Sequence, residues 1–389
     1  MRPFSFTRTG AGLLAGVVAG YAAGVWLGYP VLVALAVGGL SILAAGALTI
    51  AVRPAVVLSR RVTPDRVHVG EPALGRIDVH NTSRWPSPAF TAVDRIGDAA
   101  VDLRVGSVGG GGRRALHYPV PTPRRGRVRL GPLTVERRDP FGLMCWRRQQ
   151  TGDGVLWVRP RVHPVRQTPV GVVLDFEGRT TENARLGTVT FSTLREYVPG
   201  DDPRQIHWKS TARAGSLIVR EHIDTTEPNS TVMLDTRADV LDPDAFEHAV
   251  EVAASFVDSV EKVGRPALLR ILGERPGAAA AAGALSSLDR LALAERVTDR
   301  DPLRLLDTID RIPAGGSLVV VTGDSGPALL PRLADQRRRF TPVVVVIVLA
   351  ATATTTMGAA SRPGMTVLTV RSGVEAATAW NRASGGGPR

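Results

Sequence analysis

The strongest constraint on this chain is a run of 42 residues, 11–52, that contains no charged side chain. A break at Gly28-Tyr29-Pro30 divides the run into an apolar stretch of 18 residues, 11–28, and another of 23 residues, 30–52. Each stretch is long enough to cross a bilayer as a helix. A cleaved signal peptide has one short apolar core and then a polar mature chain, whereas apolar sequence continues here. We therefore predict an N-terminus at 1–10 and two transmembrane helices at 11–52.

Charged residues on both sides of this run predict its orientation. Arg2 and Arg8 precede it, and Arg53, Arg60 and Arg61 follow it. Both ends of a helical hairpin lie on the same side of the membrane, and Arg-rich flanks stay on the cytoplasmic side. We expect a multi-pass protein of the cell membrane whose soluble body lies in the cytoplasm.

Glycine recurs at every fourth position of the first apolar stretch, which would leave a bare stripe along a helix. A second backbone can approach such a stripe closely. That backbone belongs either to the second helix of the hairpin or to another copy of the chain, in a homodimer. The stripe consists of Gly12, Gly16, Gly20, Gly24 and Gly28.

Basic charge is concentrated just after the apolar run. Residues 53–166 contain 21 Arg and 9 Asp or Glu, a net charge of +12, against +2 before them and −2 after them. Anionic lipid attracts Arg that lies close to a membrane. Nucleic acid is the alternative partner, but interleaved aromatic residues and zinc-ligand spacings are missing from the sequence. We therefore expect anionic lipid, not nucleic acid, to contact this basic module.

The basic module, 53–166, has a β-rich pattern. Short alternating runs at 66–69, 75–80, 101–105, 116–120, 127–130 and 133–137 are separated by turn residues. They predict a small β-sandwich or barrel. The single cysteine, Cys145, excludes an internal disulfide and stands among apolar neighbours, which favours a buried residue over a nucleophile.

Strands alternate with helices in the segment 230–383. We expect strands at 230–236, 267–272, 317–322, 343–349 and 366–370, and helices at 243–263, 286–297, before about 339 and near 376. This order is typical of a doubly wound α/β domain with a parallel sheet. The Ala-rich stretch 277–283 is expected to be a loop or weak helix, and the tail 384–389 to be disordered.

The linker 167–229 contains an unusual concentration of ionisable and aromatic residues at 194–213, LREYVPGDDPRQIHWKSTAR. Asp202 suits a helix N-cap and Pro203 the first helical position, so a helix is predicted from there to about 213, ended by Gly215. Three- and four-residue spacings place the following side chains on one face of that helix: Arg204, His207, Trp208 and Thr211.

Three interpretations of this segment remain open. The charged side chains either form an ion-pair network that fixes the fold or a surface that binds a partner. The third interpretation is a hydrolase or anion-binding enzyme in which His207 acts as a general base with Asp201 or Asp202. The sequence offers no Ser or Cys elbow, P-loop or His-rich metal spacing to complete such a site. We therefore expect no catalytic activity.

The segment resembles the signature of a known bacterial family, domain of unknown function 58, whose hallmark is R-E-Y-x-x-G-D-x-x-R-x-I-x-W. The matching residues are Arg195, Glu196, Tyr197, Gly200, Asp201, Arg204, Ile206 and Trp208. The stretch 125–143 also resembles this family. The resemblance implies a membrane-anchored protein with a von Willebrand factor A-like domain that associates with MoxR-type AAA+ ATPases.

On the strength of this resemblance we expect a non-catalytic adaptor or scaffold. The signature segment and the α/β domain would bind the ATPase, whereas the client process is not indicated by the sequence. The residues expected to bind the partner are Arg195, Glu196, Tyr197, Gly200, Asp201, Asp202, Arg204, His207, Trp208 and Lys209.

The resemblance to von Willebrand factor A domains also implies a metal site with the pattern D-x-S-x-S. Residues 235–239 here read DTRAD, so both serines are missing and Arg237 replaces the first. Asp235, Asp239 and Asp324 could bind Mg²⁺ through carboxylate oxygens. The alternative, which we favour, is a metal-free fold in which Arg237 neutralises the acids. We therefore expect no cofactor.

Overall fold

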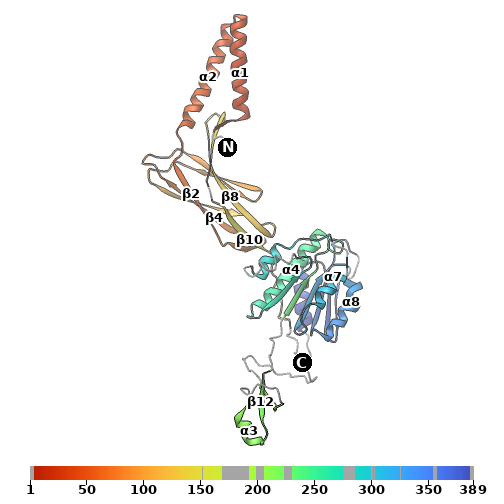
Figure 1. The fold of residues 1–389 in the computed structure, drawn as a ribbon. Helices are drawn as coiled ribbons and strands as arrows, with labels where there is room; N and C mark the ends of the chain where they lie inside the picture. Colours follow the sequence, from red (N-terminus) through yellow and green to blue (C-terminus); the bar gives the residue numbers. More distant parts are fainter. Residues whose placement is uncertain are drawn as a thin grey trace. The chain divides into compact units, whose positions relative to one another are not determined.

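The computed structural model divides the chain into two compact units, Met1–Pro160 and Arg161–Arg389 (Figure 1). It describes residues 4–150, 152–168, 192–198, 206–222, 230–274, 285–298, 301, 303–324, 326–353 and 357–385. The boundary comes before the predicted end of the basic module at 166, because Val162 and Val165 pack on the core of the second unit. The predicted loop at 277–283 lies outside the described residues.

The first unit begins with two long apolar helices, α1 (Arg8–Leu27) and α2 (Pro30–Ala51). Gly28 ends α1 with a φ of 72°, and Pro30 occupies the start of α2, where its missing N–H costs nothing. The mean hydropathies of their most apolar windows are 1.6 and 2.4, and only 11% and 17% of these windows are buried. Both helices are therefore compatible with membrane anchoring.

The glycine stripe of α1 does not pack uniformly on α2. A Cβ on Gly24 would lie 2.8 Å from Val33, and one on Gly39 of α2 would lie 2.6 Å from Val17, so the helices approach closely at these two points. The interpretation that the stripe packs within the hairpin holds for Gly24 only. A Cβ would meet no atom within 4 Å at Gly12, Gly16 or Gly20.

Backbone pairing fixes the base of the helical hairpin on the β-rich module. Strand β1 (Phe4–Phe6) pairs antiparallel with β9 (Met144–Gln150). Thr7, the N-cap of α1, accepts a hydrogen bond from the Gly10 N–H at 3.1 Å and donates its hydroxyl to the Gly142 carbonyl at 2.7 Å. A side chain on Gly10 would collide with the carbonyl oxygen of Leu143. The start of α1 therefore lies directly against the turn before β9.

The β-rich module is a sandwich of two sheets. The larger sheet contains β1, β9, β8 (Gly126–Arg138), β10 (Gly154–Arg159) and β3 (Arg66–His68), with β5 (Phe90–Ile96) and β6 (Ala99–Val105) branching from β8. The smaller contains β2 (Val56–Thr63), β4 (Ala73–Asn81) and β7 (Arg113–Val120). Buried Ile77 of the small sheet and Leu133 and Leu156 of the large one share a core.

The strands of the sandwich differ from the prediction in two ways. The two strands predicted at 127–130 and 133–137 form one long strand, β8, which passes through Gly131 with a φ of 105°. Strands β2, β5, β9 and β10 were not predicted. The sandwich nevertheless confirms one of the two predicted architectures, and Cys145 is buried in it as expected.

A buried polar cluster links the two sheets. The Arg60 guanidinium of β2 contacts the Asp94 carboxylate of β5 at 2.7 Å, with 3% and 0% of their side chains exposed. The Tyr118 hydroxyl of β7 donates to the other oxygen of Asp94. Burial, followed by the neighbouring Asp94 carboxylate, raises the pKa of Tyr118 above its usual range. Because removing one member would leave a buried charge unpaired, the cluster fixes how the sheets face each other.

The second unit contains a six-stranded sheet in the order β14-β13-β15-β16-β18-β17. The parallel strands are β13 (Ser230–Leu234), β14 (Ala267–Ile271), β15 (Ser317–Thr322), β16 (Val343–Val348) and β18 (Met365–Val370). They agree with the predicted strands. The sheet is mixed, however, because the unpredicted strand β17 (Gly358–Arg362) joins its edge antiparallel to β18.

Helices cover both faces of this sheet, as expected for a doubly wound α/β domain. One face carries α4 (Pro243–Glu261), α6 (Ser287–Ala292) and α9 (Gly373–Gly385). The other carries α7 (Leu303–Asp310), which was not predicted, and α8 (Gly326–Asp335), which continues into a 3₁₀ turn at Gln336–Arg338. The predicted tail begins inside α9, and residues 386–389 lie outside the described part.

The first residues of this unit lie across α4 and α9. The His163 N–H donates to the Ser255 hydroxyl at 2.9 Å, and the Trp380 indole N–H donates to the Arg166 carbonyl at 2.8 Å. The Trp380 ring meets that of Phe256 edge to face at 5.5 Å. We call residues 161–166 the strap, since these bonds attach them to α4 and α9, which are the first and last long helices of the domain in the sequence.

Two imidazoles and a carboxylate lie where the strap meets α4. The Glu251 carboxylate is 3.1 Å from Nε2 of His163 and 3.5 Å from Nδ1 of His248. The interaction with Glu251 raises the pKa of His248, although burial opposes it. Burial also opposes ionisation of Glu251, but the two imidazoles outweigh it, and the pKa of that carboxyl lies below its usual value.

These shifts predict a pH dependence for the α/β domain. The raised pKa of His248 gives stability that is present below its unfolded pKa, about 6.5, and is lost as the pH rises through the folded value. We expect the thermal midpoint to fall as the pH rises above about 6.5, and His248→Gln to reduce this dependence. His117→Gln, an exposed change in the first unit, is the control. An unchanged pH profile in the His248 variant would contradict the assignment.

Candidate functional site

The signature segment folds as a β-hairpin that carries a short helix. Strand β11 (Ser192–Glu196) pairs antiparallel with β12 (Ile218–His222), and α3 (Trp208–Ala214) lies between them in the chain (Figure 1). The Tyr197 N–H donates to the Leu217 carbonyl at 2.8 Å, and the His207 N–H donates to the Ile218 carbonyl at 2.7 Å. The residues on either side of α3 are thus tied to the hairpin through their backbone.

His207 is the N-cap of α3 and therefore does not lie on the helical face predicted for it with Trp208 and Thr211, whereas Arg204 lies outside the described residues. Its Nδ1 accepts the Ser210 N–H at 3.3 Å and lies 2.7 Å from the Ser210 hydroxyl. The helix begins at Trp208, five residues later than predicted, because His207 has non-helical dihedral angles, φ −88° and ψ 83°. Gly215 ends the helix with a φ of 74°, as predicted. The local cap occupies the imidazole nitrogen that a general base would need.

Large apolar side chains of this segment are exposed. The exposed fractions are 68% for Trp208, 57% for Val198 and 43% for Leu217. Lys209 and Arg213 on α3 are also exposed. Partly exposed aromatic residues beside cations are enriched in protein interfaces. The sequence analysis missed Val198 and Leu217, because single aliphatic residues beside turns resemble ordinary strand ends.

The structure brings together only part of the predicted partner-binding set. Glu196 and Tyr197 stand at the end of β11, where the Ser216 hydroxyl donates to Glu196 at 2.9 Å, and His207, Trp208 and Lys209 stand at the start of α3. Arg195 lies on β11 in register with Val219. The remaining predicted residues lie outside the described part of the chain: Gly200, Asp201, Asp202 and Arg204.

The candidate metal position at the end of β13 holds a buried ion pair. The Arg237 guanidinium contacts the Asp235 carboxylate at 2.7 Å, with 1% and 0% of their side chains exposed. The Thr322 hydroxyl of β15 donates to the same carboxylate at 2.7 Å. Asp239 and Asp324 are exposed, and among the described residues no three potential ligands gather. These residues do not fit a divalent ion, because a guanidinium already neutralises the one buried acid.

Comparison with known proteins supports the signature. Residues 193–322 match the family model described as "Protein of unknown function DUF58". An uncharacterised protein of Bacillus subtilis strain 168, YeaD, is 36% identical over 83 residues, 21% of this chain and 20% of YeaD. The chain therefore aligns with about a fifth of the length of that curated relative.

Solved structures are only distantly similar. The CARDB domain of PF1109 from Pyrococcus furiosus matches 25% of this chain and 94% of its own at 17% identity, with a TM-score of 0.20. The DNA glycosylase AlkC of Pseudomonas fluorescens matches 34% of this chain and 40% of its own at 18% identity, with a TM-score of 0.22. TM-scores this low do not indicate a shared fold or a shared function.

The hairpin and helix described above, with the residues beside them, contain the described part of the signature, and the family match begins inside β11 and ends with β15. The residues that suggested the resemblance therefore fall within the matched segment. Residues 193–322 are thus similar to the DUF58 family of proteins of unknown function, and this segment contains the signature that suggested the resemblance.

Proposed function

We propose that this protein is a non-catalytic, membrane-anchored adaptor that binds another protein through the signature segment and the α/β domain. The observation that carries the proposal is the exposure of Trp208 on α3, 68%, in a segment that also exposes Lys209 and Arg213. A Trp side chain buries a large apolar area in an interface, and such residues contribute most of the binding energy.

The partner class comes from the family resemblance, which implies a MoxR-type AAA+ ATPase. The α/β domain supports a von Willebrand factor A-like assignment, since its parallel strands are covered by helices on both faces. Asp235 follows β13, at the carboxyl edge where doubly wound sheets bind ligands. An enzyme based on His207 is less well supported, because its imidazole caps α3.

The adaptor proposal predicts the effect of removing the exposed indole. In a pull-down with a MoxR-type ATPase, Trp208→Ala should weaken capture at least tenfold, as expected for an interface hot spot. The matched control is Trp85→Ala, which removes an equally exposed indole, also 68%, from the β-sandwich. Both variants should keep the thermal midpoint of the parent. Equal capture by the Trp208 variant and the parent would refute the adaptor role of this surface.

The proposed metal-free α/β domain predicts that Arg237 has a structural role. Arg237→Ser would leave Asp235 buried without its cation, which should lower the free energy of unfolding by about 3–5 kcal/mol. The exposed Arg332→Ser is the control. Neither EDTA nor Mg²⁺ should shift the midpoint of the parent protein in thermal unfolding. A midpoint that rises with Mg²⁺ would favour a metal site instead.

We also propose that α1 and α2 cross the cell membrane and that the soluble body lies in the cytoplasm, as the Arg-rich flanks indicate. Burial, the largest effect, raises the pKa of Cys145 and makes it a poor target for maleimides. Ser59→Cys would place an exposed thiol on β2. A membrane-impermeant maleimide should label this variant in lysed cells and not in intact ones. Labelling of intact cells would show the opposite orientation.

A further inference from the structure

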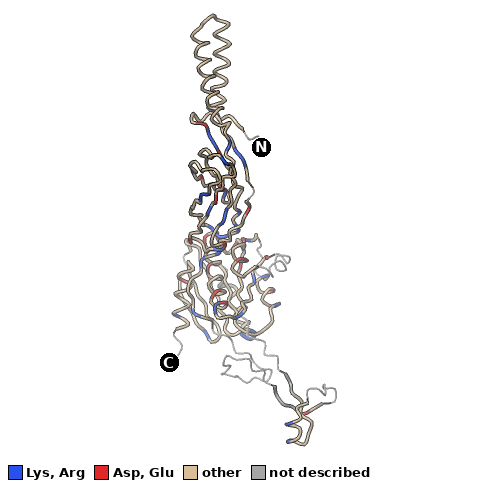
Figure 2. Tube along the Cα trace, turned by 90° about the vertical axis from the view of Figure 1, so that its left-hand side faces the viewer, with Lys and Arg blue, Asp and Glu red and all other residues tan. Residues whose placement is uncertain are grey.

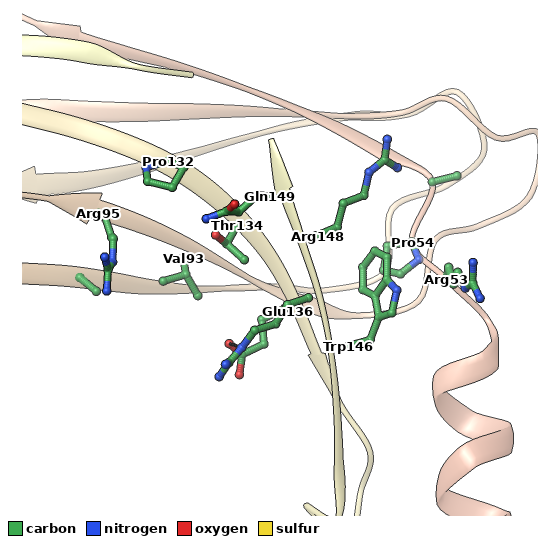
Figure 3. Close-up of a pocket in the computed structure, with 13 residues that line it drawn as sticks. Arg53, Pro54, Val93, Arg95, Pro132, Thr134, Glu136, Trp146, Arg148 and Gln149 are labelled. Atoms are coloured by element: carbon green, nitrogen blue, oxygen red, sulfur yellow. Dashed lines mark hydrogen bonds and ion pairs between the residues drawn. The ribbon is translucent and has the colours of Figure 1, made fainter. Parts of the chain in front are cut away.

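The β-sandwich contains a hollow of about 880 Å³ that the sequence analysis did not identify (Figure 3). Its walls come from β5, β6, β8 and β9 and from residues 53–55, which follow shortly after α2. Four arginines line it, Arg53, Arg95, Arg147 and Arg148, together with one carboxylate, Glu136. Segments far apart in the sequence thus gather guanidinium groups around one cavity.

Protein groups neutralise only part of the positive charge of this hollow, because four arginines and a single carboxylate line it. Arg138 and Arg147 both donate to Glu136, at 2.6 and 2.8 Å. Within the described part of the chain, the guanidinium groups of Arg95 and Arg148 make no hydrogen bond or ion pair, although their backbones pair with neighbouring strands. Figure 2 shows how Lys and Arg are distributed along the two units, including the strands of the sandwich. A cavity lined by unneutralised guanidinium groups attracts an anion.

The hollow begins at the base of the helical hairpin. Arg53 comes two residues after the end of α2 at Ala51. Arg147 and Arg148 come shortly after Leu143, which touches the start of α1, so they lie within roughly 10–17 Å of it along β9. In Figure 3, Arg53 and Arg148 stand near the end of the helix, whereas Arg95 stands at the far end of the hollow.

Exposed aromatic residues accompany these arginines at the base of the helices. Phe4 and Phe6 of β1 are 40% and 50% exposed, and Phe141 in the turn before β9 is 55% exposed. The Arg53 guanidinium lies 5.2 Å from the centre of the Phe4 ring. Aromatic rings beside cations at the end of a membrane helix are typical of the headgroup region. The Arg53 end of the hollow therefore lies beside exposed aromatic side chains at the base of the helices.

We propose that this hollow binds the headgroup of an anionic phospholipid, an inference that rests on the membrane anchoring proposed above. Guanidinium groups form paired hydrogen bonds with phosphate oxygens, and Arg53 and Arg148 are placed to contact the phosphate. Thr134 and Gln149, which face each other across β8 and β9, supply neutral hydrogen-bonding groups farther in. The headgroup of phosphatidylglycerol matches this arrangement: its phosphate would contact the arginines, and its glycerol hydroxyls would contact the neutral groups farther in.

Lipid retention by the full-length protein tests the assignment. The protein is incubated in mixed micelles with equal amounts of phosphatidylglycerol and phosphatidylcholine of the same acyl chains, and bound lipids are measured by native mass spectrometry. We expect preferential retention of phosphatidylglycerol. The double variant R53Q/R148Q should lower that affinity roughly 20-fold. Retention of both lipids in equal amounts by the parent protein would overturn the proposal without any variant.

A matched double variant distinguishes binding at a specific site from nonspecific attraction of anionic lipid by the positive charge of the sandwich. R127Q/R129Q also removes two exposed arginines of the sandwich, but from the end of β8 remote from the helices. It should change phosphatidylglycerol affinity less than about twofold. An equal loss in both double variants would overturn the site. Displacement of the lipid by low-millimolar inorganic phosphate would instead assign the hollow to a soluble anion.

Membrane extraction distinguishes failure of this inference from failure of the anchoring it rests on. The protein should remain in the membrane pellet after an alkaline carbonate wash. Release into the supernatant would contradict the anchoring itself. Retention in the pellet without preference for phosphatidylglycerol would contradict only the headgroup site.

Discussion

The first unit depends on the pairing between β1 and β9, which joins the residues before α1 to a strand of the sandwich. Thr7 extends this contact, since its N–H donates to the Leu143 carbonyl at 2.9 Å while its side chain caps α1. Hydrogen bonds on both sides of the helix start leave it little freedom to rotate. The base of the hairpin, Arg53 and the hollow therefore keep a fixed arrangement, which a flexible linker after α2 could not provide.

Much of the fold could be predicted from the sequence. Most of its helices and strands are buried either on one face or entirely, and both kinds of burial leave a recognisable pattern of apolar residues. Strands β13, β15 and β16 are buried along their whole length and appear as continuous apolar runs. Strand β17, all of whose residues are exposed, has no such pattern and was missed. The division of β8 into two strands was wrong for a related reason, because Gly131-Pro132 normally marks a turn and here stays within the strand.

The candidate sites were less predictable, for two reasons. Some depend on contacts between residues that are far apart in the chain, and others depend on which of several neighbouring residues starts a helix. Asp202 and Pro203 are stronger helix-start signals than His207, yet His207 caps α3. The hollow combines side chains from five separate stretches, and no local spacing reveals it. The Arg237 pair was predictable, because the two residues of D-x-R lie close together in any loop that follows a strand.

The strap has a mechanical consequence. If the first unit is anchored and a partner pulls on the α/β domain, as proposed above, the tension reaches that domain first through the strap, which follows directly after the unit boundary at Pro160. Its bonds to Ser255 and Trp380 lie on α4 and α9, the first and last long helices of the domain. Pulling would load these bonds before it reached the strands of the sheet. Under such a force, the strap would separate from α4 and α9 before any other part of the domain unfolded.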